Sequence, residues 1–520
     1  MKYQQKFNIG LFFCFLGLFI LPQTGLAQTK NEMRGVWMAT LLNIDWPSSS
    51  NLTTRQQKQE IISILDHHQS VGINALFLQV RPAADAFYNS SYEPWSKWLS
   101  GVQGKEPRPY YDPLVFWIDE CHRRGMELHA WFNPFRAAVN EDVSLLHRDH
   151  IVHKHPQWFV SYGGRIYFNP GLPQVRNYVT KVIMDVVNRY DIDGVHFDDY
   201  YYPYKVEGQE FSDHATYNVW GQAFNSIGDW RRDNVSTFIK NISDSIQRVK
   251  PEVRFGISPS GVWRNKEQDV SGSNTRAGQT AFDDLYADVL LWMKNGWIDY
   301  LAPQIYWHIG FEIADYQVLL DWWSRHSYGR HIYIGQSAYK VRKDADFRAW
   351  QDPGELPRHI RLNKNYPQIK GNIYFSSKSL RTNALGLGDS LKNKYRYPAV
   401  VPPMSYKPAI NLKSPYLYRI SHGHKMLTIY WSGEEKQKKD GRYQLVYRYK
   451  GDQNPGQEDP SNIIALLPPE TTSFEDTPPK KGYYTYVISS VSKTNHESLG
   501  SHPITINYRK RKPRKKKIKT

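Results

Sequence analysis

The chain has 520 residues, of which 14% are aromatic, and it carries a formal net charge of +17. Cysteine occurs only at positions 14 and 121, and because position 14 lies in a removable leader, an intramolecular disulfide is excluded from the mature chain. The charge does not point to nucleic acid, since residues 509–519 contribute nine positive charges and residues 1–27 contribute two, which leaves a mild excess of +6 for the body.

Residues 1–27 are typical of a secretory signal peptide. Lys2 and Lys6 precede an apolar run from residue 9 to residue 21, and small residues lead to Ala27. The run is too short for an ordinary membrane-spanning helix. We therefore expect cleavage near Ala27 and a soluble, exported protein in the periplasm or at the cell surface.

Between residues 32 and 395, short apolar runs alternate with longer amphipathic ones. We expect strands at residues 33–41, 74–82, 126–134, 193–198, 253–261, 298–307, 331–336 and 371–377. We expect helices at 53–72, 112–125, 172–190, in the region up to 249, and at 280–296, 314–326 and 355–362. Eight strands that alternate with helices predict an α/β fold, a (β/α)8 TIM barrel whose functional site lies on the loops after the strands.

Residues 396–404 form a proline-rich linker, and residues 405–508 read as alternating strands separated by turns. This pattern predicts a small all-β sandwich, and YYTYVISSVSKTNHESLGS (483–501) resembles the late strands of a fibronectin type III domain. Residues 509–520 form a basic tail that we expect to be disordered, because like charges repel. The tail is either a solvated end or a binding segment for an anionic envelope polymer or a membrane surface.

The stretch DGVHFDDYYYPY (193–204) is the strongest candidate for a functional site. Side chains alternate on a strand, so Gly194, His196 and Asp198 face one way, and Asp198 stands at the carboxyl end of the strand. Asp199 begins the following loop. Carboxylates beside aromatic rings at this end of a barrel suit acid, base or nucleophilic chemistry on a sugar. The alternative is a plain turn, because Asp is common where loops start.

Several strands place polar side chains on the face that points into the barrel. These side chains are Gln79, Arg81, Glu127, His129, Trp131, Asn133, His196, Asp198, Gln304 and Tyr306. A purely structural barrel fills its interior with branched apolar side chains. The convergence therefore favours a functional site over a plain turn at Asp198.

Six ordered blocks carry a family likeness: RGVWMATLLNIDWP (34–47), FLQVRPAADAFY (77–88), ELHAWFNPFRA (127–137), DGVHFDDYYYPY (193–204), FGISPSGVWRN (255–265) and DYLAPQIYW (299–307). In this order they resemble the bacterial glycosyl-hydrolase-like family 10, over about residues 32–395. The resemblance implies a secreted or envelope (β/α)8 enzyme that hydrolyses O-glycosidic bonds, with peptidoglycan glycan strands among the expected substrates.

Two mechanisms follow from such resemblances. In retaining barrel glycosidases similar to the alpha-amylases, the nucleophile also ends strand four, but His196 stands here where they carry Arg. The strand at 253–261 also supplies no Glu, where that group keeps its acid. In substrate-assisted hydrolases of N-acetylated sugars, paired carboxylates divide the work between orienting the acetamido group and protonating the leaving oxygen. We prefer Asp198 and Asp199 as a catalytic pair, since the pair needs no Glu.

The remaining candidates are substrate contacts and sugar-stacking rings. We expect them to be Arg81, His129, Asn133, His196, Tyr200, Tyr201, Tyr202, Trp263, Gln304, Tyr306 and Trp307. Asp283 and Asp284 are expected to cap the helix at 280–296. We expect no cofactor and no metal, because no ligands recur at tight spacing.

Two other classes of function stay open. The absent Glu favours a barrel that binds a polysaccharide without cleaving it, and the basic tail favours a polyanion-binding scaffold. Release of products from a glycan would separate hydrolysis from binding. The sequence predicts a polysaccharide partner and no specific nucleic acid, and it indicates no particular oligomeric state.

Overall fold

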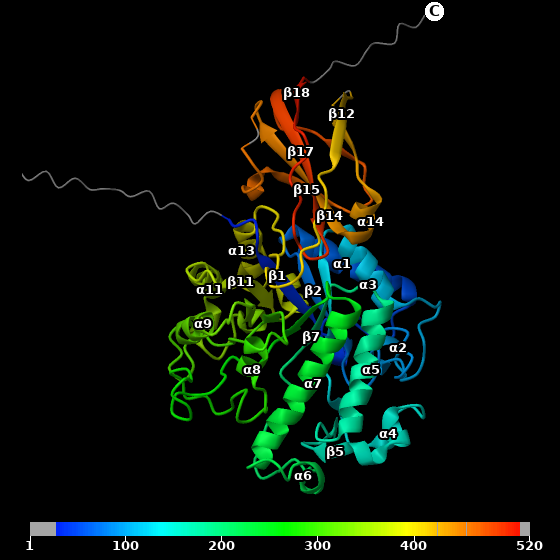
Figure 1. The fold of residues 1–520 in the computed structure, drawn as a ribbon, viewed down its shortest axis with the longest axis vertical. Coiled ribbons are helices and arrows are strands. Elements are labelled where there is room, and N and C mark those ends of the chain that lie inside the picture. Colours follow the sequence, from blue (N-terminus) through cyan, green and yellow to red (C-terminus); the bar gives the residue numbers. More distant parts are fainter. Residues whose placement is uncertain (1–27, 424, 454, 510–520) are drawn as a thin grey trace, which may run out of the picture.

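The computed structural model describes residues 28–509, apart from 424 and 454. The predicted signal peptide (1–27) and residues 510–520 of the basic tail lie outside this part. Within it, none of the helices combines the length and the apolar character that a membrane crossing requires. Figure 1 shows a large barrel surrounded by helices and, above it, a smaller part built mainly of strands.

Within the described residues, eight parallel strands close into a barrel in the order β1-β11-β10-β9-β8-β7-β3-β2. They are β1 (Met33–Met38), β2 (Ala75–Arg81), β3 (Glu127–Phe132), β7 (Gly194–Phe197), β8 (Arg254–Ile257), β9 (Tyr300–Leu301), β10 (His331–Gln336) and β11 (Ile369–Tyr374). The predicted barrel is confirmed. β9 is shorter than predicted, because Pro303 has no N–H for a ladder, and Gln304 makes only isolated bridges to Ser260 and Gly335.

Helices cover the outside of the barrel (Figure 1). The main ones are α1 (Thr54–Ser70), α3 (Pro113–Arg123), α5 (Pro173–Arg189), α7 (Ile227–Val249), α8 (Val289–Lys294), α9 (Tyr316–Arg325), α11 (Glu355–Asn363) and α13 (Leu387–Lys394). Shorter ones are α2 (Lys97–Ser100), α4 (Ile151–Lys154), α6 (His214–Trp220), α10 (Arg348–Gln351), α12 (Ser377–Arg381) and α14 (Glu435–Asp440). Side-chain caps fix the starts of α1 and α3, since Thr53 accepts from the Gln56 backbone N–H and Asp112 from that of Leu114.

The helix predicted at 280–296 begins later than expected. Residues 281–285 form turns and a bend, and only the segment from Val289 is helical. Asp288 is the N-cap of α8, so the prediction that Asp283 and Asp284 cap this helix is wrong. Asp284 instead accepts a hydrogen bond from the Thr280 backbone N–H at 2.6 Å, which closes the turn locally.

The barrel has two apolar clusters, one between the strands and the surrounding helices and one inside the barrel. The larger cluster packs the helices against the strands, through rows such as Val175 and Val179 on α5. The inner cluster contains large rings, among them Trp131 and Tyr300. Glycine provides the room for these rings, because a Cβ added to Gly256 would lie 2.0 Å from the Tyr300 ring.

Two smaller β structures accompany the barrel. The chain after β3 forms a sheet of β4 (Arg136–Ala138), β5 (Phe159–Tyr162) and β6 (Arg165–Phe168). Beyond residue 404, one antiparallel sheet contains β12 (Tyr416–His422), β13 (Leu427–Ser432) and β16 (Ser473–Asp476). The other contains β15 (Ile463–Leu467), β14 (Gly441–Lys450), β17 (Gly482–Ser492) and β18 (Ile504–Tyr508). Trp431 and Tyr486 belong to one core shared by both sheets, which confirms the all-β sandwich; the fibronectin type III likeness and the domain boundaries stay predictions.

The sandwich covers the end of the barrel where the strands begin. Arg442 of β14 pairs with Asp193, which precedes β7. Asn495 donates to Glu127, the first residue of β3, at 3.0 Å. Met404, from the chain that joins the two parts, packs into the inner barrel cluster. The carboxyl ends of the strands lie at the opposite end of the barrel, away from the sandwich.

Candidate active site

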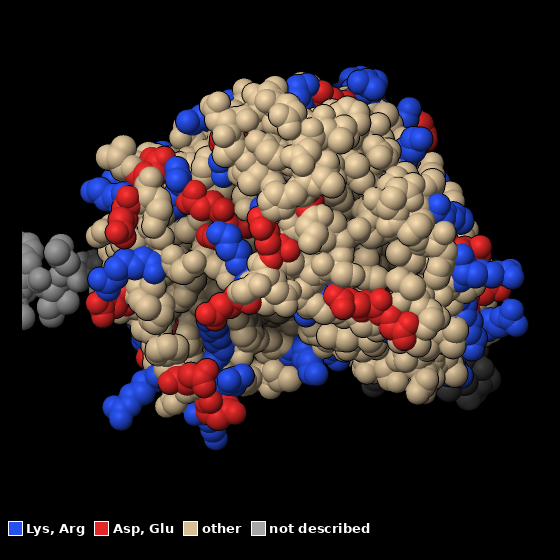
Figure 2. Space-filling model, turned by 90° about the horizontal axis from the view of Figure 1, so that it is seen from below, with Lys and Arg blue, Asp and Glu red and all other residues tan. Residues whose placement is uncertain are grey.

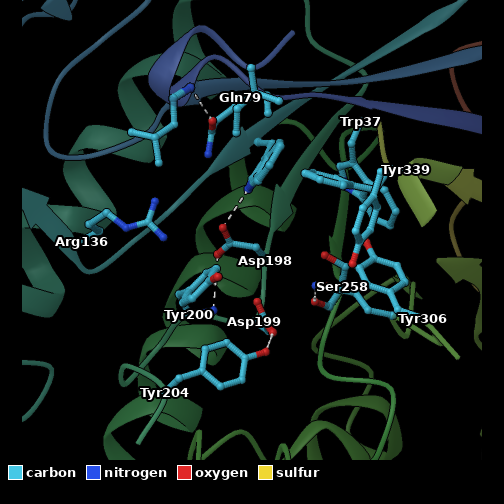
Figure 3. A pocket seen from close by; sticks show the side chains of 16 residues that line it. Trp37, Gln79, Arg136, Asp198, Asp199, Tyr200, Tyr204, Ser258, Tyr306 and Tyr339 are labelled. Carbon is cyan, nitrogen blue, oxygen red and sulfur yellow. Dashed lines mark hydrogen bonds between the residues drawn. The ribbon is translucent and has the colours of Figure 1, made fainter. Parts of the chain in front are cut away.

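A cavity of about 250 Å³ lies among the loops that follow the strands (Figure 3). It is lined by Trp37, Ala39, Leu41, Ile44, Gln79, Trp131, Arg136, Asp198, Asp199, Tyr200, Tyr204, Ser258, Gln304, Tyr306, Tyr339 and Phe375. Every barrel strand, or the loop that follows it, contributes a side chain. This is the end of a (β/α)8 barrel at which active sites form.

Asp198 follows β7 directly and is held by two donors from β3 and the loop after it. Trp131 Nε1 donates to Asp198 Oδ2 at 3.2 Å, and Asn133 Nδ2 donates to both oxygens at 3.2 and 3.1 Å. Burial raises the pKa of Asp198 to about 7, with the adjacent Asp199 adding to the rise and Arg136 opposing it. At neutral pH this carboxyl both holds and releases a proton, as an acid catalyst must.

Asp199 has different surroundings. The Tyr204 hydroxyl donates to Asp199 Oδ2. Burial raises the pKa of Asp199, and Tyr204, Arg136 and Gln304 oppose that rise by stabilising the charged form. Two adjacent carboxylates with different donors are suited to different roles in one reaction.

Arg136 is the one Lys or Arg among the described residues that line the pocket. Its guanidinium carbon lies 4.8 Å from the centre of the Tyr200 ring, on the side of the pocket that also carries Tyr204 (Figure 3). It lowers the pKa of both Asp198 and Asp199, and in the described part of the chain its Nε has no hydrogen-bond partner. This cation therefore stabilises negative charge on the pair.

Aromatic rings form the opposite wall of the pocket. Figure 3 shows Trp37, Tyr306 and Tyr339 across from Arg136 and Tyr200, with the carboxylates between. The ring centres of Tyr306 and Tyr339 are 6.1 Å apart and their planes stand at 79°. Such amphipathic rings accept the apolar face of a sugar and leave its hydroxyls free for the carboxylates.

The structure brings five predicted residues together in the lining: Asp198, Asp199, Tyr200, Gln304 and Tyr306. Asn133, also predicted, is fully buried behind Asp198. Its amide nitrogen donates to that carboxylate, and its Oδ1 accepts from the Arg136 backbone N–H at 2.9 Å. Asn133 therefore positions Asp198 and does not reach a sugar, which corrects its predicted role as a substrate contact.

Arg81 does not contact the pocket. Its guanidinium forms two hydrogen bonds with Glu93, at 2.6 and 2.7 Å, and both side chains are fully buried. It also donates to the carbonyls of Asn133 and Pro134 at 2.6 and 3.0 Å. The prediction of a sugar contact is wrong, because these donors already tie the loops after β2 and β3 together.

Four predicted stacking rings lie outside the lining. Tyr201 and Tyr202 are 1% and 2% exposed, and Trp263 stacks on Trp322 with ring centres 5.8 Å apart. Trp307 is half-buried among the apolar residues around the barrel. A ring enclosed by other side chains offers no face to a sugar, so the prediction that Tyr201, Tyr202 and Trp263 contact the substrate is wrong. Trp307 is not enclosed in this way, and its contact with the substrate stays a prediction.

His129 and His196 lie inside the barrel, beneath the pocket. The Trp37 indole can only donate, and it donates to His196 Nε2 at 3.1 Å. His196 Nδ1–H therefore donates to the Tyr300 oxygen at 3.1 Å, and the Tyr300 hydroxyl donates to His129 Nδ1 at 2.8 Å. His129 Nε2–H then donates to Glu127 at 3.1 Å. Burial lowers the pKa of His129 to about 3 and that of His196 well below its usual range, so both imidazoles are neutral. Their hydrogen bonds stabilise the residues beneath the pocket. The prediction that His129 and His196 contact a sugar is therefore wrong.

Arg136, Tyr204, Ser258, Tyr339 and Phe375 line the pocket without having been predicted. Ser258 directly follows β8, and the alternation of side chains along that strand could have predicted that it faces the pocket. Tyr204 closes the quoted block 193–204, so its aromatic signal was present. Tyr339 and Phe375 lie in segments that follow barrel strands, and Arg136 lies on the additional sheet. In these places no regular spacing in the sequence indicates which side chains face the pocket.

Among the described residues, no three His, Cys, Asp or Glu side chains gather as a metal site. The pocket presents two carboxylates, a guanidinium and a wall of rings. Glycoside hydrolases of the barrel type cleave sugars with such carboxylates at the strand ends, and the chain is an enzyme of that class. It belongs to the family described as Glycosyl hydrolase-like 10, which matches residues 32–352. This membership favours hydrolysis over glycan binding alone.

The relatives carry hydrolase names as well. The chain is 45% identical over 502 residues to Glycosyl hydrolase YngK of Bacillus subtilis (strain 168), covering 94% of this chain and 97% of that one. It is 40% identical over 376 residues to Glycosyl hydrolase DigH of Escherichia coli (strain K12), covering 68% and 85%. The solved glycoside hydrolase domain of PgaB (BpsB) from Bordetella bronchiseptica aligns with a TM-score of 0.45 and 12% identity, over 73% of this chain and 100% of that one.

Proposed function

We propose that the protein is exported and hydrolyses O-glycosidic bonds in a polysaccharide of the cell envelope, with peptidoglycan glycan strands as the substrate class. Export is supported by residues 1–27, whose sequence is typical of a signal peptide. The observation that carries the proposal is the pair Asp198 and Asp199, two buried carboxylates that line one pocket and accept from different donors.

Asp198 acts as the general acid. With a pKa of about 7, it is largely protonated in slightly acidic solution and about half protonated in neutral solution. Its proton moves to the glycosidic oxygen while the bond between that oxygen and the anomeric carbon breaks. Trp131 and Asn133 then stabilise the carboxylate left behind. General acid catalysis of this kind accelerates a reaction by about 10²–10⁴-fold.

Asp199 orients the acetamido group of an N-acetylated sugar. The carboxylate accepts the acetamido N–H, so that the acetamido carbonyl oxygen attacks the anomeric carbon as the leaving oxygen takes its proton. Water then opens the cyclic intermediate, its proton returns to Asp198, and the acetamido group is restored. Tyr204 holds Asp199 in place through its hydrogen bond. This route needs no Glu at the end of β8, where Ser258 stands.

The end of the molecule that carries the pocket supports a sugar polymer as substrate. Figure 2 looks onto this end, and uncharged residues form most of it, with acidic and basic side chains interspersed. A face of mixed charge does not attract a strongly charged polymer over a long range. Binding at the pocket then relies on stacking against Tyr306, Tyr339 and Trp37 and on hydrogen bonds.

The test compares wild type with Asp198→Asn and Asp199→Asn on purified peptidoglycan glycan strands, with and without stem peptides, by mass analysis of the released sugars. We expect products from wild type and a loss of about 10²-fold or more in each variant. A loss in Asp198→Asn alone would indicate a single carboxylate with an acid elsewhere. Equal release by all three proteins would contradict the assigned site, and no release by any of them would contradict the substrate class.

A further inference from the structure

The outer face of the β12-β13-β16 sheet exposes a pair of parallel aromatic rings. Tyr416 and Tyr418, both on β12, are 67% and 51% exposed. Their ring centres lie 6.2 Å apart, and their planes differ by 25°. The sandwich core is already filled from the other face of the sheet by Leu417 and Trp431, so the pair is not needed for packing. Large exposed rings that lie together indicate a binding surface.

A β-bulge creates this arrangement. Leu417 lies opposite Trp431, but the register then shifts, and Arg419 lies opposite Tyr430. The extra residue is Tyr418, so two consecutive side chains, Tyr418 and Arg419, are exposed on the same strand. The Arg419 guanidinium carbon lies 4.9 Å from the centre of the Tyr430 ring, which holds the cation beside the stacked pair.

The last described residue lies beside the end of β12 that is farther from the tyrosine pair. The backbone N–H of Arg509, the last described residue, donates to His422 Nε2 at 3.2 Å. The sequence that follows, residues 510–520, carries eight further Lys and Arg. The chain therefore leaves the sandwich from β18 and passes the end of β12 at His422.

We propose that Tyr416, Tyr418, Arg419 and Tyr430, here called the β12 face, bind a polysaccharide that carries carboxylates. The tyrosine rings stack on sugar faces, and their exposed hydroxyls remain hydrogen-bonded to water or to sugar hydroxyls. Arg419 pairs with a carboxylate of the polymer, for which its planar guanidinium is suited. A membrane surface fits less well, because such sites present Trp, Phe and Leu, none of which belongs to the β12 face.

This surface is separate from the catalytic pocket. The β12 face belongs to the sandwich, which contacts the barrel where the strands begin, as the bond from Asn495 to Glu127 shows. The pocket lies at the carboxyl ends of the same strands. The β12 face therefore holds the enzyme on its polymer without occupying the pocket, and its binding is measurable whether or not hydrolysis is observed.

The test is cosedimentation of the full-length protein, on ice, with two kinds of bead. One carries immobilised peptidoglycan strands stripped of stem peptides, which bear carboxylates, and the other is chitin, which bears none. We expect the double variant Tyr416→Ala/Tyr418→Ala to bind both polymers about tenfold more weakly than wild type. Arg419→Gln should weaken binding to the peptidoglycan strands alone. Hydrolysis of a short soluble oligosaccharide should be unchanged in all these variants, because their substitutions lie outside the pocket.

Tyr483→Ala is the matched control, since Tyr483 is 57% exposed on β17 in the other sheet of the same sandwich. This variant should sediment as wild type does. Unchanged sedimentation of the double variant, or an equal loss in Tyr483→Ala, overturns the proposal. Sedimentation with vesicles of phosphatidylglycerol and phosphatidylcholine tests binding to a membrane surface. If the double variant loses binding to the vesicles but keeps binding to the polysaccharides, the proposal is also overturned.

Discussion

Asn133 Nδ2 lies 3.2 and 3.1 Å from the two carboxylate oxygens of Asp198 and donates to both. This amide favours the charged form of the carboxyl and fixes its orientation toward the pocket. We predict that Asn133→Ala lowers kcat about 100-fold with little change in KM, because the acid is misplaced in the transition state. Steady-state kinetics on glycan strands measures this, and Asn133→Gln should recover part of the loss. An increase in KM with kcat unchanged would instead make Asn133 a sugar contact.

Tyr204→Phe tests the bond that holds Asp199. Without the hydroxyl donor, the pKa of Asp199 rises further and its orientation is lost. We predict a fall in kcat of about tenfold or more. Tyr201→Phe is the control, because the Tyr201 hydroxyl is buried and has no partner within the described residues. Equal activity of the two variants would contradict the role of Tyr204 in holding Asp199.

Arg136 sets the pH range of activity. Asp198 must be protonated to act as an acid, so kcat/KM should fall as the pH rises through about 7. Arg136 lowers the pKa of Asp198, and its removal therefore raises that pKa. We predict that Arg136→Gln moves the alkaline limb of the profile upward by about one pH unit or more. Arg136→Lys, which keeps the charge, should leave the limb near its wild-type position, and a limb that moves downward in Arg136→Gln would contradict this assignment.

The ionic contacts beneath the barrel join its strands to the sandwich. Arg442 is buried and pairs with Asp193 and, at 3.5 Å, with Glu127. We predict that Arg442→Met lowers the free energy of unfolding by about 3–5 kcal/mol, because two buried carboxylates lose a partner. Urea unfolding measures this loss.

The matched control for Arg442 is a pair on the surface. Arg276 and Glu312 are 64% and 86% exposed, so Arg276→Met should change the free energy of unfolding by no more than about 1 kcal/mol. Similar effects of Arg442→Met and Arg276→Met would show that the contacts beneath the barrel do not stabilise the fold.

Regular strand geometry explains what could be predicted. The eight strands follow from apolar runs, and the placement of Asp198 in the pocket follows from the end of β7 and its alternating side chains. Arg136 and Tyr204 lie where the chain has left the barrel strands, and there the direction of a side chain depends on distant packing. The sequence has no local period that reflects this packing. The aromatic character of Tyr204 was evident in the block 193–204, but the direction of its side chain and that of Arg136 became visible only in the structure.

Side-chain partners elsewhere in the fold separate the candidates that line the pocket from those that do not. Arg81 stands at a strand end, as the pocket residues do, but Glu93 in the following loop takes its guanidinium. Tyr202 follows the carboxylates in sequence, yet its ring packs against Arg231 of α7, whose guanidinium carbon lies 5.5 Å from the ring centre. The tertiary fold determines which side chains become partners, and the type of a residue in the sequence does not reveal its partner.

The division of labour between Asp198 and Asp199 is tested most directly by changing the leaving group. In a dinitrophenyl glycoside of an N-acetylated sugar, the leaving group is dinitrophenolate, which departs without taking up a proton. A sugar leaving group needs a proton from an acid. We predict that Asp198→Asn keeps most of its activity on the dinitrophenyl glycoside while losing about 10²–10⁴-fold on glycan strands. Asp199→Asn should lose activity on both substrates, because both need the acetamido group. Equal losses by the two variants on both substrates would contradict the assignment of Asp198 as the acid.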